Sequence, residues 1–330
     1  MNRYPLFDRF PALAEALAPV PLANLPTSVH ALRSSRYSNL WIKRDDLTHA
    51  EYGGNKVRKL EFVLADIRRK KAKHVITFGA TGTNAGVATA MLCKQEGLAC
   101  SIATFPQVDS QTVRKNQKWM HYYGANLIPF SSLLRAAMWF HLSPARMKRN
   151  NYFLYAGCSN PVATFAYVNA AFELAEQIRQ GFCPEPAQIL VPVGSASTLA
   201  GLTLGCHLAG LTTSVLGVRV APAHVGPFAA CTTGVVKSFM RYADREIRRI
   251  CGIHLKCSPE PVLLENYYGS GYGIPTERAR YAIDLFRDEW GIELESTYSG
   301  KAAAAFIDVM ENNKGPLLFW NTYNSRLPPF

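Results

Sequence analysis

The chain has 330 residues, of which 48% are hydrophobic and 18% charged, and its formal net charge is +12. This composition is typical of a soluble globular protein, and the length favours two domains over one. No segment approaches the roughly 18 consecutive apolar residues that a membrane span needs. The N-terminal segment also lacks the uninterrupted apolar stretch of a secretory signal. We therefore expect a cytoplasmic protein with no membrane partner.

The eight cysteines are scattered and form no C-x-x-C pair, which favours reduced, mostly buried thiols over disulfides or a metal site. The positive charge is compatible with a nucleic-acid partner. However, the densest basic run, Arg68 to His74, lies at the expected end of a helix, where the helix dipole favours cations. We therefore predict a solvated surface and no nucleic-acid partner, with attraction of an anionic substrate or cofactor as a further effect.

After residue 55 the chain alternates between apolar strand-like segments and segments with helical periodicity. This alternation predicts βαβ units, and hence an α/β fold with mostly parallel sheets covered by helices on both faces. There is no internal repeat or low-complexity linker. In chain order we predict helices over 55–71, 83–97, 109–124, 161–181, 197–210, 276–291 and 299–313, and strands over 74–80, 98–105, 125–130, 152–157, 187–195, 214–221, 261–269 and 315–322.

Two glycine-rich turns lie where a predicted strand leads into a helix, which is where open α/β sheets bind ligands. In the first, Gly194, Ser195, Ala196, Ser197 and Thr198 combine small residues with hydroxyls at a helix start, as a phosphate site would. A turn that merely caps the helix is an equally good interpretation. This first turn has neither the lysine of a nucleotide P-loop nor a G-x-G-x-x-G fingerprint.

The second turn, "FGATGTNAG", places Thr83 and Asn84 at the start of another predicted helix that follows a strand. There they could bind a carboxylate or a ring oxygen. Taken alone, it is better explained as a helix cap. Tyr272 and Tyr298 each lie in a glycine-rich loop before a helix and are candidates for acid–base chemistry.

Lys56 follows Gly53 and Gly54 and precedes an amphipathic helix. A phosphate site, a lysine in a flexible loop and the absence of a metal or nucleotide motif together indicate pyridoxal phosphate. Its aldehyde bonds to a lysine and its ring accepts electrons from a carbanion.

The segment "IKRDDLTHAEYGGNKVRKLEF" resembles the cofactor-lysine segment of the 1-aminocyclopropane-1-carboxylate deaminase and D-cysteine desulfhydrase family. That family belongs to the tryptophan-synthase-β-like, fold-type-II pyridoxal phosphate enzymes, and the resemblance runs in order over nearly the whole chain. It implies two open, twisted, mostly parallel sheet domains with pyridoxal phosphate between them, in a homodimer. Residues 1–60 and 165–330 would form the large domain, with residues 61–164 inserted as a small α/β domain.

The resemblance also implies roles for individual residues. Lys56 falls on the cofactor lysine, Asn84 on an asparagine that contacts the ring hydroxyl, and Thr83 in the place of a substrate-binding serine. The phosphate loop would be Gly194, Ser195, Ala196, Ser197 and Thr198.

Tyr272 and Tyr298 fall on two active-site tyrosines, and Ser299 falls beside the pyridine nitrogen. Ser299 and Thr322 favour the desulfhydrase branch, because the deaminases resemble Y-E-G-K and carry a leucine near the C-terminus. A neutral hydroxyl would leave the ring a weaker electron sink than a carboxylate would, and this suffices for expelling a good leaving group.

Two segments depart from the family pattern. Gly82, Thr83 and Asn84 replace Q-S-N, and residues Asn321 to Asn324 replace H-T-G-G. Side chains at glycine positions would narrow or reshape a substrate site. The altered terminal segment also leaves open a non-catalytic, pyridoxal phosphate-binding homologue.

The favoured reaction is α,β-elimination from D-cysteine to pyruvate, ammonia and hydrogen sulfide. The alternative substrates are 1-aminocyclopropane-1-carboxylate and other small amino acids. Lys56 would abstract the α-proton, assisted by Tyr298 or Tyr272. We expect Lys59 and Arg58 to be turned away from Lys56 on the helix, and we expect Lys43 to be a structural ion-pair residue.

Overall fold

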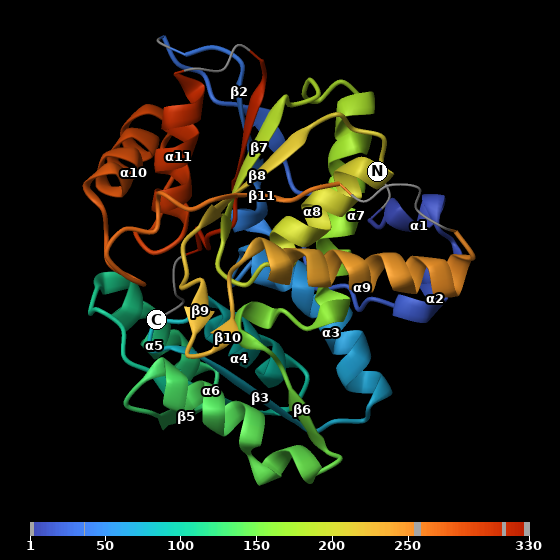
Figure 1. Ribbon diagram of the computed structural model, residues 1–330, viewed down its shortest axis with the longest axis vertical. Coiled ribbons are helices and arrows are strands. Elements are labelled where there is room, and N and C mark those ends of the chain that lie inside the picture. Colours follow the sequence, from blue (N-terminus) through green and yellow to red (C-terminus); the bar gives the residue numbers. More distant parts are fainter. Residues whose placement is uncertain (1–2, 36, 254–258, 312–314, 327–330) are drawn as a thin grey trace.

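The computed structural model describes residues 3–35, 37–253, 259–311 and 315–326, which form two separate sheets flanked by helices (Figure 1). The large sheet has six strands in the order β1-β2-β12-β7-β8-β11. Its first pair, β1 with β2, is antiparallel, and its other pairs are parallel. The strands are Val29–Ala31 (β1), Leu40–Arg44 (β2), Gln188–Val193 (β7), Ser214–Arg219 (β8), Val262–Leu264 (β11) and Leu317–Asn321 (β12).

The small sheet has four strands in the order β5-β4-β3-β6, all paired in parallel. Strands β9 and β10 form a short antiparallel hairpin that is separate from both of these sheets. These strands are His74–Ala80 (β3), Ala99–Phe105 (β4), Asn126–Pro129 (β5), Asn151–Phe153 (β6), His224–Val225 (β9) and Phe228–Ala229 (β10).

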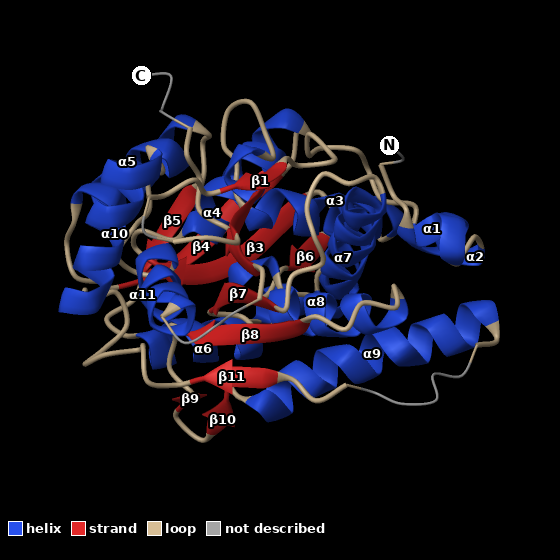
Figure 2. Ribbon diagram, turned by 90° about the horizontal axis from the view of Figure 1, so that it is seen from above, coloured by secondary structure: helices blue, strands red, loops and turns tan. Residues whose placement is uncertain are grey.

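Helices cover both faces of the large sheet, with α10 and α11 on one side and α7, α8 and α9 on the other (Figures 1 and 2). Short 3₁₀ turns occupy Asp45–Leu47, Pro144–Met147, Ala156–Cys158 and Pro161–Ala163. The α-helices are Leu6–Arg9 (α1), Ala12–Leu17 (α2), Asn55–Arg69 (α3), Asn84–Gln95 (α4), Gln111–Tyr122 (α5), Leu133–Leu142 (α6), Thr164–Arg179 (α7), Ser197–Leu208 (α8), Thr233–Cys251 (α9), Glu277–Trp290 (α10) and Ser299–Met310 (α11).

Strand β12 shows why this sheet needs a helical layer on each face. Its residues are all buried, and successive side chains of a strand point to opposite faces. Leu318 and Trp320 join the core cluster that includes α7 and α8, whereas Leu317 and Phe319 join the cluster that includes α10 and α11. The predicted α/β class with mostly parallel sheets is confirmed.

Two other findings bear on the sequence predictions. Seven cysteines of the described residues are free thiols, six of them buried, while Cys257 lies outside the described residues. Within the described part of the chain, each helix is too short or too polar to span a bilayer.

Candidate active site

The glycine pair before Lys56 lets the chain pass very close to neighbouring backbone. Gly54 has φ +97°, which favours glycine, and a Cβ on Gly53 would lie 2.0 Å from the carbonyl oxygen of Asp46. The amide of Asn55 then donates to the Thr322 carbonyl at 3.2 Å. Helix α3 therefore begins against the end of β12, with Lys56 in its first turn.

Lys56 is partly exposed between buried neighbours, and its Nζ donates to Asn55 Oδ1 at 2.6 Å. Burial lowers the pKa of Lys56, although Cys158 and Glu295 act in the opposite direction. A lowered pKa increases the fraction of neutral amine, which is the form that acts as nucleophile or base.

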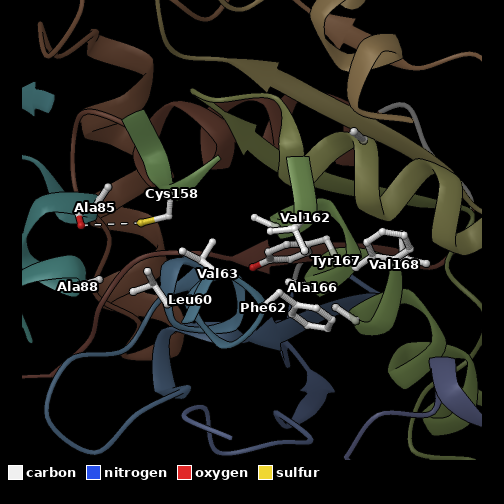
Figure 3. Packing of buried hydrophobic residues seen from close by; sticks show 14 of the residues in the cluster. Leu60, Phe62, Val63, Ala85, Ala88, Cys158, Val162, Ala166, Tyr167 and Val168 are labelled. Atoms are coloured by element: carbon white, nitrogen blue, oxygen red, sulfur yellow. Dashed lines mark hydrogen bonds between the residues drawn. The ribbon is translucent and has the colours of Figure 1, made fainter. Parts of the chain in front are cut away.

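The apolar side of α3 fixes the direction of this helix. In Figure 3, Leu60 and Val63 lie between Ala85 and Ala88 of α4 on one side and residues of α7 on the other. Cys158 lies beside them, with its Sγ 3.9 Å from the carbonyl oxygen of Ala85. Lys56 therefore lies in the first turn of a packed helix rather than in a free loop.

Lys59 does not turn away from the site, so that prediction is wrong. Its Nζ lies 3.3 Å from the Gly157 carbonyl oxygen and 3.4 Å from Ser159 Oγ, and the residue is fully buried. The reason is its spacing, since Lys59 lies three residues after Lys56 in α3. Three steps of 100° amount to about 300°, which returns Lys59 to the same side. Burial and the charge of Lys56 hold the pKa of Lys59 well below its usual range.

Arg58 does point away, into a buried ion cluster. Its guanidinium contacts Asp45 Oδ1 at 2.8 Å and Glu173 Oε1 at 2.9 Å. Lys43 contacts the same Glu173 carboxylate at 2.5 Å, with both side chains fully buried. This contact agrees with the structural role predicted for Lys43.

The loop from Gly194 to Thr198 joins β7 to the start of α8. Ser159 Oγ lies 2.7 Å from Ser195 Oγ and 2.8 Å from Ser197 Oγ, and so ties the two serines together. Ala196 has φ +56°, and Asn55 Nδ2 donates to Thr198 Oγ1 at 3.3 Å. The loop is thereby linked directly to the turn that carries Lys56.

Thr83 and Asn84 lie at the start of α4. Thr83 Oγ1 accepts the Gly86 amide at 3.2 Å, so the predicted helix cap is present. Asn84 Oδ1 accepts from Tyr52 Oη at 3.1 Å and from Asn116 Nδ2 at 2.6 Å. Since two donors hold this oxygen, the amide nitrogen is the group of Asn84 that could donate to a ligand.

Tyr272 and Tyr298 are brought together by a hydrogen bond between their hydroxyls. Burial raises the pKa of Tyr272 to about 12, and burial together with Tyr272 holds the pKa of Tyr298 well above its usual range. Both phenols therefore remain protonated at neutral pH. A Cβ on Gly194 would lie 3.0 Å from the Tyr298 ring, so the tyrosine pair lies directly against the serine-rich loop.

Lys301 supports the segment that carries Tyr272. Its fully buried side chain donates from Nζ to the carbonyl oxygens of Tyr268, at 2.6 Å, and Gly271, at 3.3 Å. These bonds fix the chain immediately before Tyr272.

Glu295 is a candidate site residue that the sequence did not predict. Its buried carboxylate accepts backbone N–H groups from Thr297, Tyr298 and Ser299, at 2.7, 2.7 and 2.8 Å. The Glu295 amide in turn donates to Ser299 Oγ at 2.8 Å. The sequence does carry a signal for Glu295, because an acidic residue just before a helix start is typical of a helix cap.

The terminal segment meets the same region. Thr322 is partly exposed and contributes its backbone carbonyl to Asn55, as described above. Asn321 is fully buried, and its Oδ1 accepts the Tyr323 amide at 3.2 Å. Its Nδ2 has no hydrogen-bond partner among the described residues.

Comparison with known proteins identifies the family. Residues 14–317 match the model of a family described as pyridoxal-phosphate dependent enzymes. The chain belongs to this family. This pyridoxal-phosphate dependent enzyme is 30% identical over 324 residues to the Nocardicin C-9' epimerase of Nocardia uniformis, with 94% of each chain covered. It is also 30% identical over 326 residues to a D-cysteine desulfhydrase of Klebsiella pneumoniae, covering 95% of this chain and 94% of that one.

Solved structures agree with the family assignment of this pyridoxal-phosphate dependent enzyme. A crystal structure of a homologue of 1-aminocyclopropane-1-carboxylate (ACC) deaminase superposes with a TM-score of 0.81 and 26% identity, covering 98% of this chain and 95% of that one. Threonine deaminase isoform 2 from Solanum lycopersicum has a TM-score of 0.65 at 16% identity, covering 97% and 90%, and shows the shared fold. The predicted fold type and the predicted cofactor, pyridoxal phosphate, are confirmed.

The donor set of this pyridoxal-phosphate dependent enzyme fits the cofactor's phosphate. The hydroxyls of Ser195 and Ser197 and the Nζ of Lys59 all lie within 3.4 Å of Ser159 Oγ. Thr198 follows Ser197 in the first turn of α8, and helix starts bind phosphate. A Cβ on Gly157 would lie 2.3 Å from Ser195 Oγ, so this cradle depends on a glycine. Lys56, three residues before Lys59, would then meet the cofactor's aldehyde.

Proposed function

We propose that this enzyme catalyses α,β-elimination from D-cysteine, or from a small amino acid like it, to give pyruvate, ammonia and hydrogen sulfide. The observation that carries the proposal is the combination of a partly exposed lysine of lowered pKa with a hydrogen-bonded tyrosine pair beside a phosphate cradle. Similarity to a D-cysteine desulfhydrase supports the choice of substrate.

In the proposed mechanism, bound pyridoxal phosphate supplies the electron sink that stabilises negative charge at the substrate's α-carbon. Neutral Lys56 takes the α-proton. Tyr298, or Tyr272 through their shared hydrogen bond, donates a proton to the sulfur as the carbon–sulfur bond breaks. Water then converts the released enamine into pyruvate and ammonia.

Residues around Asn84 would orient the substrate and the ring. With its oxygen held by Tyr52 and Asn116, Asn84 would use its amide nitrogen to donate to the ring. Thr83, whose Oγ1 caps α4, and Thr322 would contact the substrate, and Ser299 would face the pyridine nitrogen. A serine there, rather than a carboxylate, supports elimination over opening of a cyclopropane ring.

A direct assay tests the proposed function. The holoenzyme is mixed with D-cysteine, L-cysteine or 1-aminocyclopropane-1-carboxylate, and 2-oxo acid, ammonia and sulfide are quantified. We expect equimolar pyruvate, ammonia and sulfide from D-cysteine. 2-Oxobutanoate from the cyclopropane amino acid alone would indicate the deaminase instead, which the similarity to an ACC deaminase homologue makes the second candidate.

The same mixtures prepared in deuterium oxide, with the amino acids recovered and analysed by mass spectrometry, give two further outcomes. Exchange of the α-proton with solvent deuterium, without elimination, would indicate chemistry of the kind named for the epimerase relative. Cofactor binding with no reaction on any of these amino acids would indicate a non-catalytic homologue and overturn the proposal.

We also propose that residues 1–60 and 165–330 form a large domain into which residues 61–164 are inserted as a small one. The distribution of strands supports this division, since β3 to β6 make one sheet and β1, β2, β7, β8, β11 and β12 the other. We further propose a cytoplasmic homodimer, which light scattering of the purified holoenzyme would test by giving twice the mass of one chain.

A further inference from the structure

The hydroxyl of Ser159 reaches the phosphate cradle from outside the loop that forms this cradle. Ser159 follows the 3₁₀ turn Ala156–Cys158, which comes after β6 of the small sheet. The cradle loop, Gly194 to Thr198, instead follows β7 of the large sheet. Ser159 therefore brings a polar group to the cradle from a segment that is distant in sequence and leads out of the other sheet.

Neighbouring hydrogen bonds hold the segment that carries Ser159. The next residue, Asn160, donates from Nδ2 to Tyr152 Oη of β6 at 2.8 Å. Its Oδ1 accepts the Tyr155 amide at 2.9 Å, which closes the turn on itself. Both Ser159 and Asn160 are buried. The Ser159 hydroxyl is therefore presented to the cradle by a turn that is fixed to the small sheet.

The hydrogen bonds of Ser159 decide how the cradle serines can use their own hydrogens. A serine hydroxyl has one hydrogen to donate and two lone pairs that accept. Ser159 Oγ donates to Ser195 Oγ at 2.7 Å, while the Gly157 carbonyl oxygen lies farther away at 3.3 Å. With that hydrogen in use, Ser197 must be the donor in its 2.8 Å bond to Ser159. Lys59 Nζ donates to the same Ser159 oxygen at 3.4 Å.

The two cradle serines consequently differ in what they offer a ligand. Ser197 uses its hydrogen on Ser159 and is fully buried. Ser195 is partly exposed, and because its oxygen accepts from Ser159 it could donate its own hydrogen to a ligand. Hydrogen bonds in a chain polarise one another, so the accepted bond makes Ser195 a stronger donor.

We propose that Ser159 is a positioning residue of the cofactor site, which directs the hydrogen of Ser195 toward the cofactor's phosphate. Ser197 and Lys59 support Ser159 by donating to its oxygen. This inference concerns the cofactor and not the amino acid named in the proposed function. The binding experiment below involves no turnover, so either conclusion can fail without the other.

The test compares pyridoxal phosphate with pyridoxal, which has the same aldehyde but no phosphate. Both are titrated into the apoenzyme, and the ratio of their affinities isolates the contribution of the phosphate. Ser195→Ala should lower this ratio about tenfold or more, the effect of losing a bond to a charged group. Ser159→Ala should lower it about threefold or more, because Ser195 remains but its hydrogen is no longer directed. Ser197→Ala should lower it less than either.

A double variant separates positioning from direct contact. If Ser159 acts through Ser195, its hydroxyl has no further effect once residue 195 is alanine. The double variant, Ser159→Ala with Ser195→Ala, should then have the same ratio as Ser195→Ala alone. Ser238→Ala, at an exposed position of α9, is the matched control and should keep the wild-type ratio. Inorganic phosphate, titrated into each apoenzyme, should rank the variants in the same order.

Three results would overturn the inference. A wild-type ratio in Ser159→Ala, whether both affinities are kept or both fall alike, would show that this hydroxyl does not act on the phosphate. Losses that add in the double variant would show that Ser159 acts independently of Ser195. A larger fall in Ser197→Ala than in Ser195→Ala would reverse the roles of the two cradle serines.

Discussion

Lys56 and Lys59 lie on the same side of α3 but contact different parts of the site. Lys56 is partly exposed and bonded to Asn55, whereas Lys59 is fully buried against Gly157 and Ser159. Burial lowers the pKa of both, and Lys56 lowers that of Lys59 further. A phosphate dianion beside Lys59 would offset this burial cost by favouring the charged ammonium.

Lys59→Met should therefore weaken cofactor binding by about tenfold to a hundredfold, since a charge-assisted bond to phosphate contributes roughly 1.5–3 kcal/mol. The measurement is the dissociation constant of pyridoxal phosphate from titration of the apoenzyme. Lys71→Met, at an exposed position after α3, is the matched control and should bind as the wild type does. Equal affinity of the two variants would contradict the role given to Lys59.

At this scale the sequence predicted the residues whose local pattern is distinctive. The paired glycines before Lys56 and the serine-rich turn at Gly194 have such a pattern, and the structure shows why each glycine is needed. Ser159 has no such pattern, and the capping pattern of Glu295 is common to many helix starts. Ser159 contacts residues far along the chain, and Glu295 accepts from a turn that folds back onto it. Spacing in the sequence alone could not identify either residue.

Among the elements, β2, α3 and α7 are joined by a buried ion cluster. Lys43, Arg58 and Glu173 come from these three elements in turn, and their charged groups are fully buried. Burial alone would raise the pKa of Glu173, but Arg58 and Lys43 outweigh it and lower the pKa to about 2. Buried charges are tolerable only when they are paired in this way.

The cluster predicts an acid-sensitive contribution to stability. Because the pKa of Glu173 is lower in the folded state than its ordinary 4.5, its contribution is complete above pH 4.5 and is lost as the pH falls toward 2. That contribution amounts to about 3 kcal/mol. In urea unfolding, the free-energy difference between wild type and Glu173→Gln should shrink over this pH range. A difference that stays constant from pH 5.5 to pH 2.5 would contradict this account.

The elements were predictable where a segment has one clear periodicity. Alternating apolar strands and longer helices gave the α/β class, and β3, β4, β7 and β8 lie within their predicted segments. The order of strands was not predictable, because β12 pairs between β2 and β7, which are distant in sequence. Helix α9, Thr233–Cys251, was not predicted, although Thr232 caps its start and Gly252 ends it.

For the whole molecule, the candidate site draws on both sheets. The serine-rich loop follows β7 of the large sheet, and Asn84 follows β3 of the small one. Bonds from Asn55 to Thr198 and from Tyr52 to Asn84 connect the two sides to one turn of the chain. A cofactor held there would contact both units at once.

Cofactor binding should therefore stabilise both units together. At a concentration one hundred times its dissociation constant, pyridoxal phosphate should add about 2.7 kcal/mol to the free energy of unfolding. Hydrogen exchange should slow in the amides of β3 as well as in those of β7. Protection confined to β7 would show that the small sheet does not take part in cofactor binding.

The central claim is that Lys56 is the residue that binds pyridoxal phosphate covalently. The holoenzyme is reduced with borohydride, digested, and mapped by mass spectrometry for the peptide that carries the cofactor. We predict modification of Lys56 in the wild type, and no stable modification in Lys56→Ala, which should also lose cysteine elimination. Modification of Lys59 or of another lysine in the wild type, with Lys56 unmodified, would contradict the account.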